Sequence, residues 1–555
     1  MNRIIPWRGD RLPHLNTGGP VTERRISSTP RLSGAFVLAA ATALLLSSCA
    51  SSEESATGDA LAGVSGPVGT QTDAGEPVSG GTLSFGSLAL PATLDPARTM
   101  ATGSTGGTEM AAIYDVLVRF DGQGGEFEPQ LAEDLTVSED GKTWTLTLRD
   151  GVTFSNGESL DAEAVRWSID RYVANRGPDS QLWKNAVSSI SAPDDSTVIF
   201  ELSTPWATFP NMLAMGPGMI VAAQSDGAEN FTPIGAGPFV LESNKPNEQI
   251  QLERREGYWG GDAKLDGIRF LPSAGGQQQL DMFNTGQLEM FFTVEAGIVA
   301  DVVEAGNPGY LNVMNAGNDV LINNAEGRPG SDLRVRQALI KAVDPVAFDE
   351  RTQDGIGRPS VALFSEASRW NTGAPASKYD PEGARSLLAE AKADGYDGKI
   401  TFTTRQAPEA QARALAIQAM LNSVGFDAEV EFLNSTSDII RVINVEKNYD
   451  LGQSALSIRD SAPFLKLYSV FHSNSTGNAS GYSNPAMDEL LGTLQKAGTP
   501  EEIQSAIDDI ESLATDTVPT LPLAAQDNLV VWQPEVQGAS HSFADIMLLD
   551  EVWLS

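Results

Sequence analysis

The sequence predicts a large protein of α/β or mixed architecture. From Gly80 onward, segments with the two-residue period of strands alternate with capped helical segments, and no short repeat indicates a solenoid. The chain has 555 residues, enough material for about three or four domains, and 41% of them are hydrophobic. Its 21 Phe, 9 Trp and 9 Tyr residues are sufficient to anchor large buried cores.

Strands are predicted where apolar and polar residues alternate beside turn residues. In Thr143–Arg149, one tryptophan and two leucines fall on one face and threonines on the other, which is typical of a half-buried strand. Asp140-Gly141, just before this segment, is a hairpin turn signal. Further strands are expected at residues 81–85 and 198–202.

Helices are predicted from their capping residues. Asp161 can accept a hydrogen bond from the first turn of a helix that runs to Asn175. Thr499 and Glu502 have the spacing of a capping box and precede an amphipathic segment. Other helices are expected to begin at Asp332, at Asp380-Pro381 (ending at Gly395) and at Asn484-Pro485 (ending at Gly498).

The charge and the cysteine content exclude several classes of function. With 73 acidic and 37 basic side chains and a net charge of −36, the surface cannot neutralise the phosphates of a nucleic acid. The same acidity argues against charge-driven docking on an anionic lipid surface. One cysteine excludes an intrachain disulfide framework, and three histidines leave little for a zinc site.

Residues 1–48 have the organisation of a secretory signal peptide. Arg24, Arg25 and Arg31 precede an uncharged, mostly apolar run at residues 35–46, which is followed by small residues. This run of 12 residues is shorter than the roughly 20 that a helix needs to cross a bilayer. The long stretch before Arg24 leaves open a start of translation further along, for example at Val21.

The lone cysteine lies at the end of this signal. Leu46-Ser47-Ser48-Cys49 resembles the bacterial lipobox, which implies that Cys49 is diacylated and becomes the mature N-terminus. Residues 49–78 contain no Lys, Arg or aromatic residue and many Ser, Gly and Thr, so we expect a flexible tether. The protein would then be held on the extracytoplasmic face of the cell membrane by a lipid anchor, without spanning it.

The sequence contains none of the common catalytic motifs. There is no G-x-S-x-G nucleophile elbow, no phosphate-binding G-x-x-x-x-G-K-[ST] loop, no G-x-G-x-x-G dinucleotide turn and no H-E-x-x-H metal site. Paired carboxylates such as Asp194/Asp195 and Asp508/Asp509 fall in turns or on outer helix faces, which is typical of solvated surface. A binding protein is therefore favoured over an enzyme, and no cofactor is indicated.

An ordered set of segments resembles the extracytoplasmic solute-binding proteins, family 5, of ABC importers, the oligopeptide, dipeptide and nickel-binding group. The similarity runs in family order from about Gly80 to the last strand, so it does not depend on a single motif. The segments are Gly80–Leu83 with Leu94–Pro96, Ile113–Asp121, Phe127–Arg171, Pro233–Glu242, Glu256–Phe270, Asp332–Asp344, Tyr379–Ala391, Gly481–Leu491 and Val518–Leu523.

This resemblance implies a periplasmic-binding-protein-like fold of two lobes, the Venus-flytrap type, with an extra domain in lobe I. Chain crossings near residues 320 and 522 would act as hinges. Mapped by motif order, lobe I takes residues 79–112, 233–320 and 522–555, the extra domain 113–232 and lobe II 321–521.

The resemblance also implies function and partners. A peptide or peptide-like solute would bridge the two lobes and shift an open–closed equilibrium. An ABC permease with its ATPase would recognise the closed form, and the receptor itself would act as a monomer. Three alternatives remain: a surface peptidase or hydrolase, a sensory clamshell receptor without transport, and a nickel-type binder of metal complexes that uses His472 or His541.

Two neighbouring residues are candidates for the ligand anchor. Peptide-binding members of the family carry a W-x-x-D-x-x-D-P-like stretch, whose carboxylate meets the ammonium group of the ligand. Here the matching stretch, 457–463, lacks the tryptophan and has Ala462 at the second acidic position. Asp460 would pair with a cationic terminus, whereas Arg459 would offer a forked donor to a carboxylate. We expect Arg459→Ala and Asp460→Ala to weaken binding with little effect on melting.

Two further segments are expected to reach the ligand. Thr102, Gly103 and Ser104 lie where family members present a loop to the solute, and their small or hydroxylated side chains allow close backbone approach. Trp370 falls in a region that helps to line the cleft in this family. A surface linker and a core tryptophan are the respective alternatives.

Overall fold

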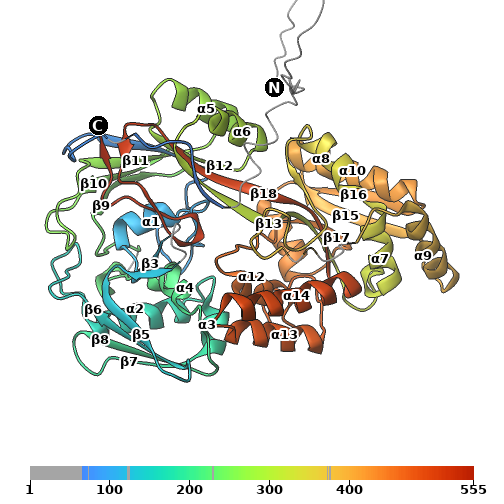
Figure 1. Cartoon of the computed structure of the whole chain (residues 1–555), viewed down its shortest axis with the longest axis horizontal. Coiled ribbons are helices and arrows are strands. Elements are labelled where there is room, and N and C mark those ends of the chain that lie inside the picture. Colours follow the sequence, from blue (N-terminus) through green and yellow to red (C-terminus); the bar gives the residue numbers. More distant parts are fainter. Residues whose placement is uncertain (1–64, 73, 122–125, 228–229, 372, 374–376) are drawn as a thin grey trace, which may run out of the picture. The chain divides into compact units, whose positions relative to one another are not determined.

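A twelve-stranded sheet runs through the part of the chain that the computed structural model describes, residues 65–555 without 73, 122–125, 228–229, 372 and 374–376. One half of it, which we call lobe I, ends at β9, and the other half, lobe II, ends at β16 (Figure 1). In spatial order the strands are β16 (Asp427–Leu433), β15 (Lys399–Arg405), β17 (Leu451–Ser454), β13 (Gly309–Ile322), β18 (Thr520–Trp532), β12 (Met290–Thr293), β2 (Thr82–Ser87), β11 (Gly267–Pro272), β10 (Gln249–Arg254) and β9 (Phe239–Lys245). Two short strands are added at the side, β1 (Gly66–Val68) on β13 and β14 (Arg358–Pro359) on β18.

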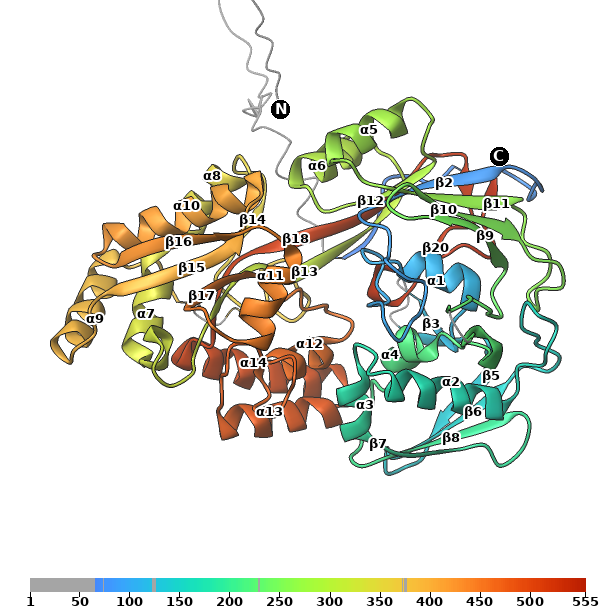
Figure 2. The same ribbon diagram turned by 180° about the vertical axis from the view of Figure 1, so that it is seen from behind.

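Two long strands carry the chain between the lobes. β13 and β18 pair antiparallel from Gly309↔Val531 to Leu321↔Thr520, and their register shifts around Asn318. One end of this ribbon pairs with β12 and the other with β17, as Figure 2 shows from behind. The hinge crossings expected near residues 320 and 522 therefore lie in continuous strands. A bulge in such a ribbon is a point where the strand can bend.

Lobe I is covered by helices α5 (Gly276–Asn284) and α6 (Ala296–Glu304), which bury a small apolar cluster against β12, β13 and β18. The opening strand expected at residues 81–85 is β2. The C-terminal segment forms short ribbons, β19 (Val536–Gln537) with β22 (Trp553–Leu554) and β20 (Ser540–His541) with β21 (Met547–Leu548).

The extra domain contains a four-stranded antiparallel sheet in the order β5 (Ala132–Val137), β6 (Thr143–Leu148), β8 (Thr197–Leu202) and β7 (Val187–Ser191). Strict alternation of buried residues in β6 confirms the strand predicted there. Asp161 caps α2 (Ala162–Ala174) by accepting from the Ala164 N–H, as predicted. The remaining elements between residues 107 and 225 are α1 (Gly107–Tyr114), β3 (Val118–Phe120), β4 (Phe127–Pro129), α3 (Ser180–Ala186), α4 (Pro210–Leu213) and two short 3-10 helices, η1 (Gly216–Gly218) and η2 (Ala223–Ser225).

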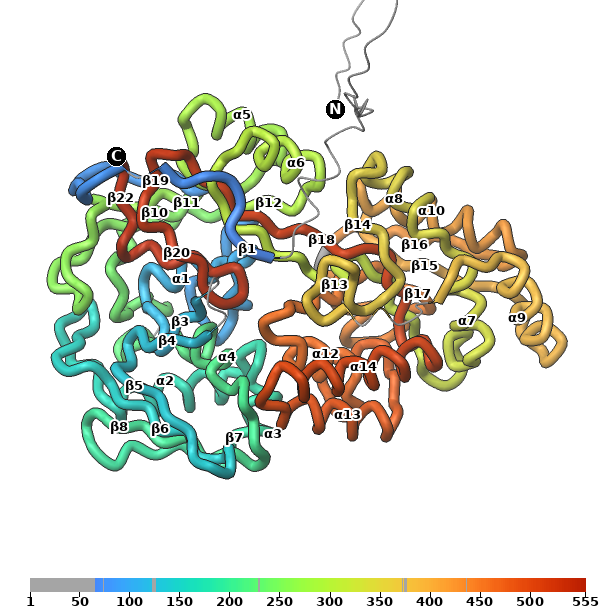
Figure 3. Tube along the Cα trace, viewed as in Figure 1, coloured from blue at the N-terminus to red at the C-terminus, as the bar shows by residue number. Residues whose placement is uncertain are grey.

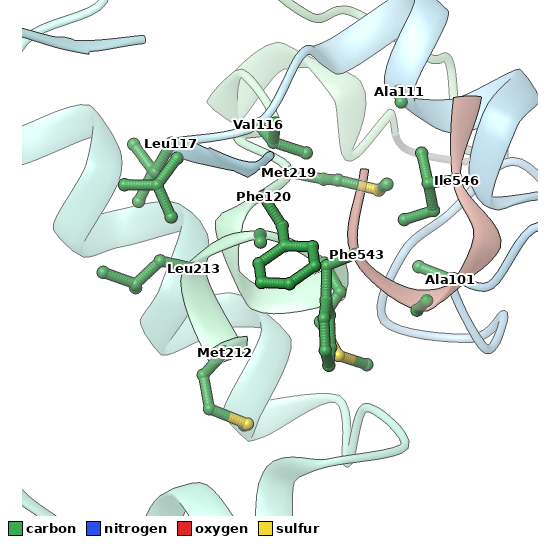
Figure 4. Packing of buried hydrophobic residues seen from close by; sticks show 14 of the residues in the cluster. Ala101, Ala111, Val116, Leu117, Phe120, Met212, Leu213, Met219, Phe543 and Ile546 are labelled. Atoms are coloured by element: carbon green, nitrogen blue, oxygen red, sulfur yellow. The ribbon is translucent and has the colours of Figure 1, made fainter. Parts of the chain in front are cut away.

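The core of the extra domain continues into the C-terminal segment. Phe120 and Phe543 lie edge to face with ring centroids 6.4 Å apart, and Met212, Leu213 and Ile546 surround them (Figure 4). Residues separated by more than 400 positions thus share one apolar cluster, which fixes the 540s loop on lobe I.

Lobe II has two parts. The first packs α7 (Leu333–Ala342), α8 (Pro345–Thr352), α9 (Pro381–Ala393) and α10 (Pro408–Ser423) with β15–β17 around one core. The second contains α12 (Pro463–Phe471), α13 (Pro485–Lys496) and α14 (Pro500–Thr517), whereas the short α11 (Thr436–Ile439) contacts β15 and β16. The caps predicted at Asp332, Asp380, Asn484 and Thr499 are all present, including the Thr499–Glu502 capping box.

Helix α12 contacts the extra domain of the other lobe. The rings of Trp206 and Phe464 lie 5.4 Å apart, and Asn185 Nδ2 donates to the Tyr468 hydroxyl at 2.8 Å. The lobes therefore touch at this side as well as at the hinge ribbon.

The N-terminal part differs in one respect from the expected tether. Within residues 49–78, β1 forms a regular pair with β13, where the sequence predicted flexible chain (Figure 3). The signal peptide and Cys49 lie outside the described residues. Among the described helices, none combines the length and the apolarity needed to cross a membrane.

Candidate functional site

Asp460 is saturated by donors from its surroundings. Its Oδ1 accepts from Asn315 Nδ2 at 2.8 Å and from the Ser368 hydroxyl at 2.6 Å, and its Oδ2 accepts from the Arg369 N–H at 2.9 Å. The residue is only 9% exposed. A cationic ligand would have to displace these hydrogen bonds, so the carboxylate acts as a fixed node between the hinge strand and the 365–371 loop.

Trp370 is held on the backbone of the same residue. Its Nε1 donates to the Asp460 carbonyl at 2.8 Å, and the Arg369 Nη2 donates to the same oxygen at 2.8 Å. The Arg369 guanidinium also lies 4.8 Å from the centroid of the Trp370 ring, a cation–π distance. Trp370 is buried, which agrees with the core-packing alternative for this residue.

Arg459 points to the other lobe. Its Nη2 donates to Oδ2 of Asp545 at 3.0 Å, whereas its Nε is buried with no hydrogen-bond partner among the described residues. The side chain is 23% exposed, against 2% for that of Asp545. Arg459 thus has donor capacity that this ion pair does not use.

Asp545 is a buried carboxylate whose surroundings favour its ionised form. Burial alone would raise its pKa, but the Arg459 charge, the nearby His541 and a hydrogen bond from Asn528 Nδ2 at 3.0 Å outweigh burial and hold the pKa below its ordinary value. Asn312 Nδ2 donates to the other carboxylate oxygen. Asp545 therefore stays ionised and keeps attracting Arg459 across the lobes.

The backbone around Asp545 is strained. Ala544 and Asp545 have φ angles of 60° and 62°, in the left-handed region that non-glycine residues rarely adopt. Such residues cost on the order of 1–3 kcal/mol each and persist where their surroundings impose them. Here the neighbouring Phe543 packs in the shared core, which holds the loop in place.

The 102–104 loop meets this strained segment. The Gly103 N–H donates to the Ala544 carbonyl at 2.9 Å, and a Cβ on Gly103 would come 1.9 Å from the Asp545 carbonyl oxygen. Thr102 and Ser104 hydrogen-bond to each other through their hydroxyls at 3.0 Å. Only glycine permits this approach. Thr102, Gly103 and Ser104 thus lie at the Ala544–Asp545 segment that Arg459 contacts, whereas Asp460 and Trp370 belong to a separate hydrogen-bonded group.

The family assignment follows from comparison with known proteins. Residues 126–478 match the family model described as "Bacterial extracellular solute-binding proteins, family 5 Middle". This chain belongs to that family. The expected two-lobed fold and the role of solute-binding receptor for an ABC importer are confirmed.

Relatives of this family 5 solute-binding protein differ in what they bind. The nickel-binding periplasmic protein of Escherichia coli (strain K12) is 26% identical over 449 residues, 76% of this chain and 86% of that protein. The glutathione-binding protein GsiB of Shigella dysenteriae is 26% identical over 410 residues, 71% and 80% of the two chains. The periplasmic binding protein DppA of Helicobacter pylori, solved with the peptide STSA, has a TM-score of 0.72 at 23% identity and covers 86% and 98%. The family consists of extracytoplasmic solute-binding proteins, not of enzymes.

Lys466 is a site residue that sequence reasoning missed. It lies half-buried in α12 and makes no hydrogen bond or ion pair with any described residue. Burial lowers its pKa and the nearby Arg459 charge lowers it further, whereas Asp319 and Asp179 act in the opposite direction. No motif marks it, because its neighbours come from the hinge, the extra domain and the preceding loop.

The two histidines of the body lie in separate environments. His541 Nε2 is 2.8 Å from Asn312 Nδ2, and its ring stacks on Tyr310. His472 lies at the end of α12, with Nδ1 3.9 Å from Asp488 Oδ1. Among the described residues, no group of three or more His, Cys, Asp or Glu is placed to hold a metal ion.

Proposed function

We propose that this receptor is anchored to the cell membrane through a lipid on Cys49 and captures a peptide or peptide-like solute, whose carboxylate is bound by Arg459. The assignment of Arg459 as the residue that binds the ligand rests on a difference between two adjacent side chains. Asp460 already accepts three hydrogen bonds, whereas Arg459 has an unpartnered Nε and reaches the opposite lobe. Of the two candidates left open by the sequence, Arg459 is therefore the one with free capacity.

The location of Arg459 supports a role in closure. It belongs to lobe II, and its partner Asp545 belongs to a loop that is packed on lobe I beside Gly103. A carboxylate that entered here would pair with a guanidinium from one lobe and lie beside the backbone of the other. Because such a ligand gains full contact only when both lobes meet, its binding favours the closed form that the permease recognises.

Blocked peptides distinguish the two possible anchors. A set of tri- and tetrapeptides is prepared free, N-acetylated and C-amidated, and binding is measured by calorimetry on the purified receptor. If Arg459 holds the carboxylate, amidation should weaken binding by about 10- to 100-fold, because a hydrogen bond to a charged group contributes roughly 1.5–3 kcal/mol. N-acetylation should have little effect.

Variants test the same assignment from the protein side. Arg459→Ala should bind free and amidated peptides equally, whereas Arg405→Ala, an exposed arginine of lobe II, should behave as the wild type. The reverse pattern, with acetylation harmful and amidation harmless, would assign the anchor to Asp460. Uptake of the bound peptide by cells that lack this protein would separate a transport receptor from a sensory one.

A further inference from the structure

The segment 65–72, which we call the N-terminal strap, pairs with the hinge ribbon formed by β13 and β18. Its strand β1 pairs antiparallel with the first residues of β13, and the Val313 N–H donates to the Ser65 hydroxyl at 2.9 Å. Gly69 has a φ of +67°, and a Cβ there would lie 2.0 Å from the Asn307 carbonyl oxygen. The strap thus has a backbone path that requires glycine at this point.

Gln71 fastens the other end of the strap to β18 and the chain that follows it. Its Oε1 accepts from Trp532 Nε1 at 2.7 Å, and its Nε2 donates to the carbonyls of Pro534 at 3.2 Å and Val536 at 3.0 Å. One side chain therefore makes three hydrogen bonds to lobe I. Gln71 therefore fixes the position of the strap on lobe I.

The strap forms one wall of a cavity of about 270 Å³. Strap residues Pro67, Val68 and Gln71 line one side, and Tyr310, Trp532 and His541 line the rest together with small residues of the 538–540 segment. An apolar cavity of about 150 Å³ is large enough to bind benzene. The space beside the strap is therefore sufficient for an aromatic ring.

The lining of this cavity is rich in aromatic rings and largely uncharged. Tyr310 and His541 are stacked, with centroids 3.7 Å apart and planes at 5°. Burial and the Arg459 charge lower the pKa of His541, whereas Asp545 acts in the opposite direction, and the net shift favours the neutral imidazole. Asp121 is the charged residue of the lining, which disfavours an anionic group and tolerates a neutral or cationic one. Planar aromatic surfaces of this kind stack on other flat rings.

The cavity lies close to the proposed carboxylate site. His541 lines the cavity and lies within 2.8 Å of Asn312 Nδ2, and Asn312 also donates to Asp545, the partner of Arg459. A solute held at Arg459 is therefore separated from the cavity by this short chain of side chains.

We propose that the cavity beside the strap binds a flat, uncharged ring of the solute, and that the N-terminal strap thereby sets part of the specificity of the receptor. The identity of the ring as part of the transported solute rests on the proposed function. The existence of the ring site does not, because it can be tested with ring compounds alone.

The test uses saturation-transfer NMR on the purified mature chain, with indole and 4-methylphenol as neutral rings and benzoate as an anionic ring. The neutral rings should give a saturation-transfer signal, and benzoate a much weaker one. Ala539→Phe, which fills the cavity from its half-buried wall, should abolish the signal. Ala305→Phe, the same change at an exposed position on lobe I, should preserve it. A chain that starts at Asp73, and so lacks the strap, should also lose the signal.

Each outcome supports or overturns either the ring site or the role of the strap. Absence of any signal with the wild-type protein, or equal signals from Ala539→Phe and Ala305→Phe, would overturn the ring site. A signal that survives removal of the strap would overturn its role in specificity. Urea unfolding of each variant shows whether a lost signal reflects a filled cavity or an unfolded chain. If the ring site is confirmed while none of the peptides binds, free or blocked, the proposed solute class is wrong and the ring site stands.

Discussion

Removal of the Asp460 carboxylate should destabilise the ligand-free protein. The sequence suggested that Asp460→Ala would weaken binding with little change in melting, whereas the hydrogen bonds that Asp460 accepts lead us to expect a loss of stability. The substitution leaves Asn315 Nδ2, the Ser368 hydroxyl and the Arg369 N–H without their acceptor in a site that is 9% exposed. With roughly 1–3 kcal/mol for each stranded donor, and some relief from rotation of the hydroxyl, we expect a loss of about 3–5 kcal/mol.

Urea unfolding followed by far-UV circular dichroism, without ligand, measures this loss directly. The matched control is Asp508→Ala, an exposed carboxylate of α14 that accepts a hydrogen bond from Gln504 in the same helix. That change should alter the unfolding free energy by no more than about 0.5 kcal/mol. An unfolding midpoint for Asp460→Ala equal to that of the control would refute the assignment of Asp460 as a structural node.

Two other predictions concern stability and the strap. Asp115 is buried at the end of α1, and burial together with the charge of Asp550 raises its pKa to about 7. Its contribution to the unfolding free energy is therefore complete below about pH 4 and is lost as the pH rises to 7. The urea midpoint of Asp115→Asn should therefore fall less than that of the wild type between pH 4 and 7, and parallel curves would contradict this. Gly69→Ala should release the strap to limited proteolysis, whereas Gly75→Ala, where no atom lies within 4 Å of the added Cβ, should not. Equal cleavage of the two variants would show that the close approach to Asn307 is unimportant.

The sequence predicted most of the local structure, because local signals determine it. The alternation in β6, the Asp161 cap and the Thr499–Glu502 capping box each depend on residues within a few positions of one another. The family segments then supplied the two-lobed fold, which no local signal contains.

The site was less predictable, because its contacts join distant parts of the chain. Asp460 takes its donors from residues 91 to 145 positions away, so its saturation is invisible in the sequence around it. Asp545 lies in a loop with no motif, and its left-handed backbone is imposed by packing. The strap contains Gly66-Pro67 and reads as a linker, yet the free edge of β13 makes it a strand.

Native mass spectrometry of the receptor released gently from cell membranes examines the lipid anchor and the bound solute together. We expect a chain that begins at a diacylated Cys49 and carries one bound solute with a free carboxylate, and the solute should be lost from Arg459→Ala and kept by Arg405→Ala. A chain without lipid at Cys49, or a solute retained equally by both variants, would contradict this expectation.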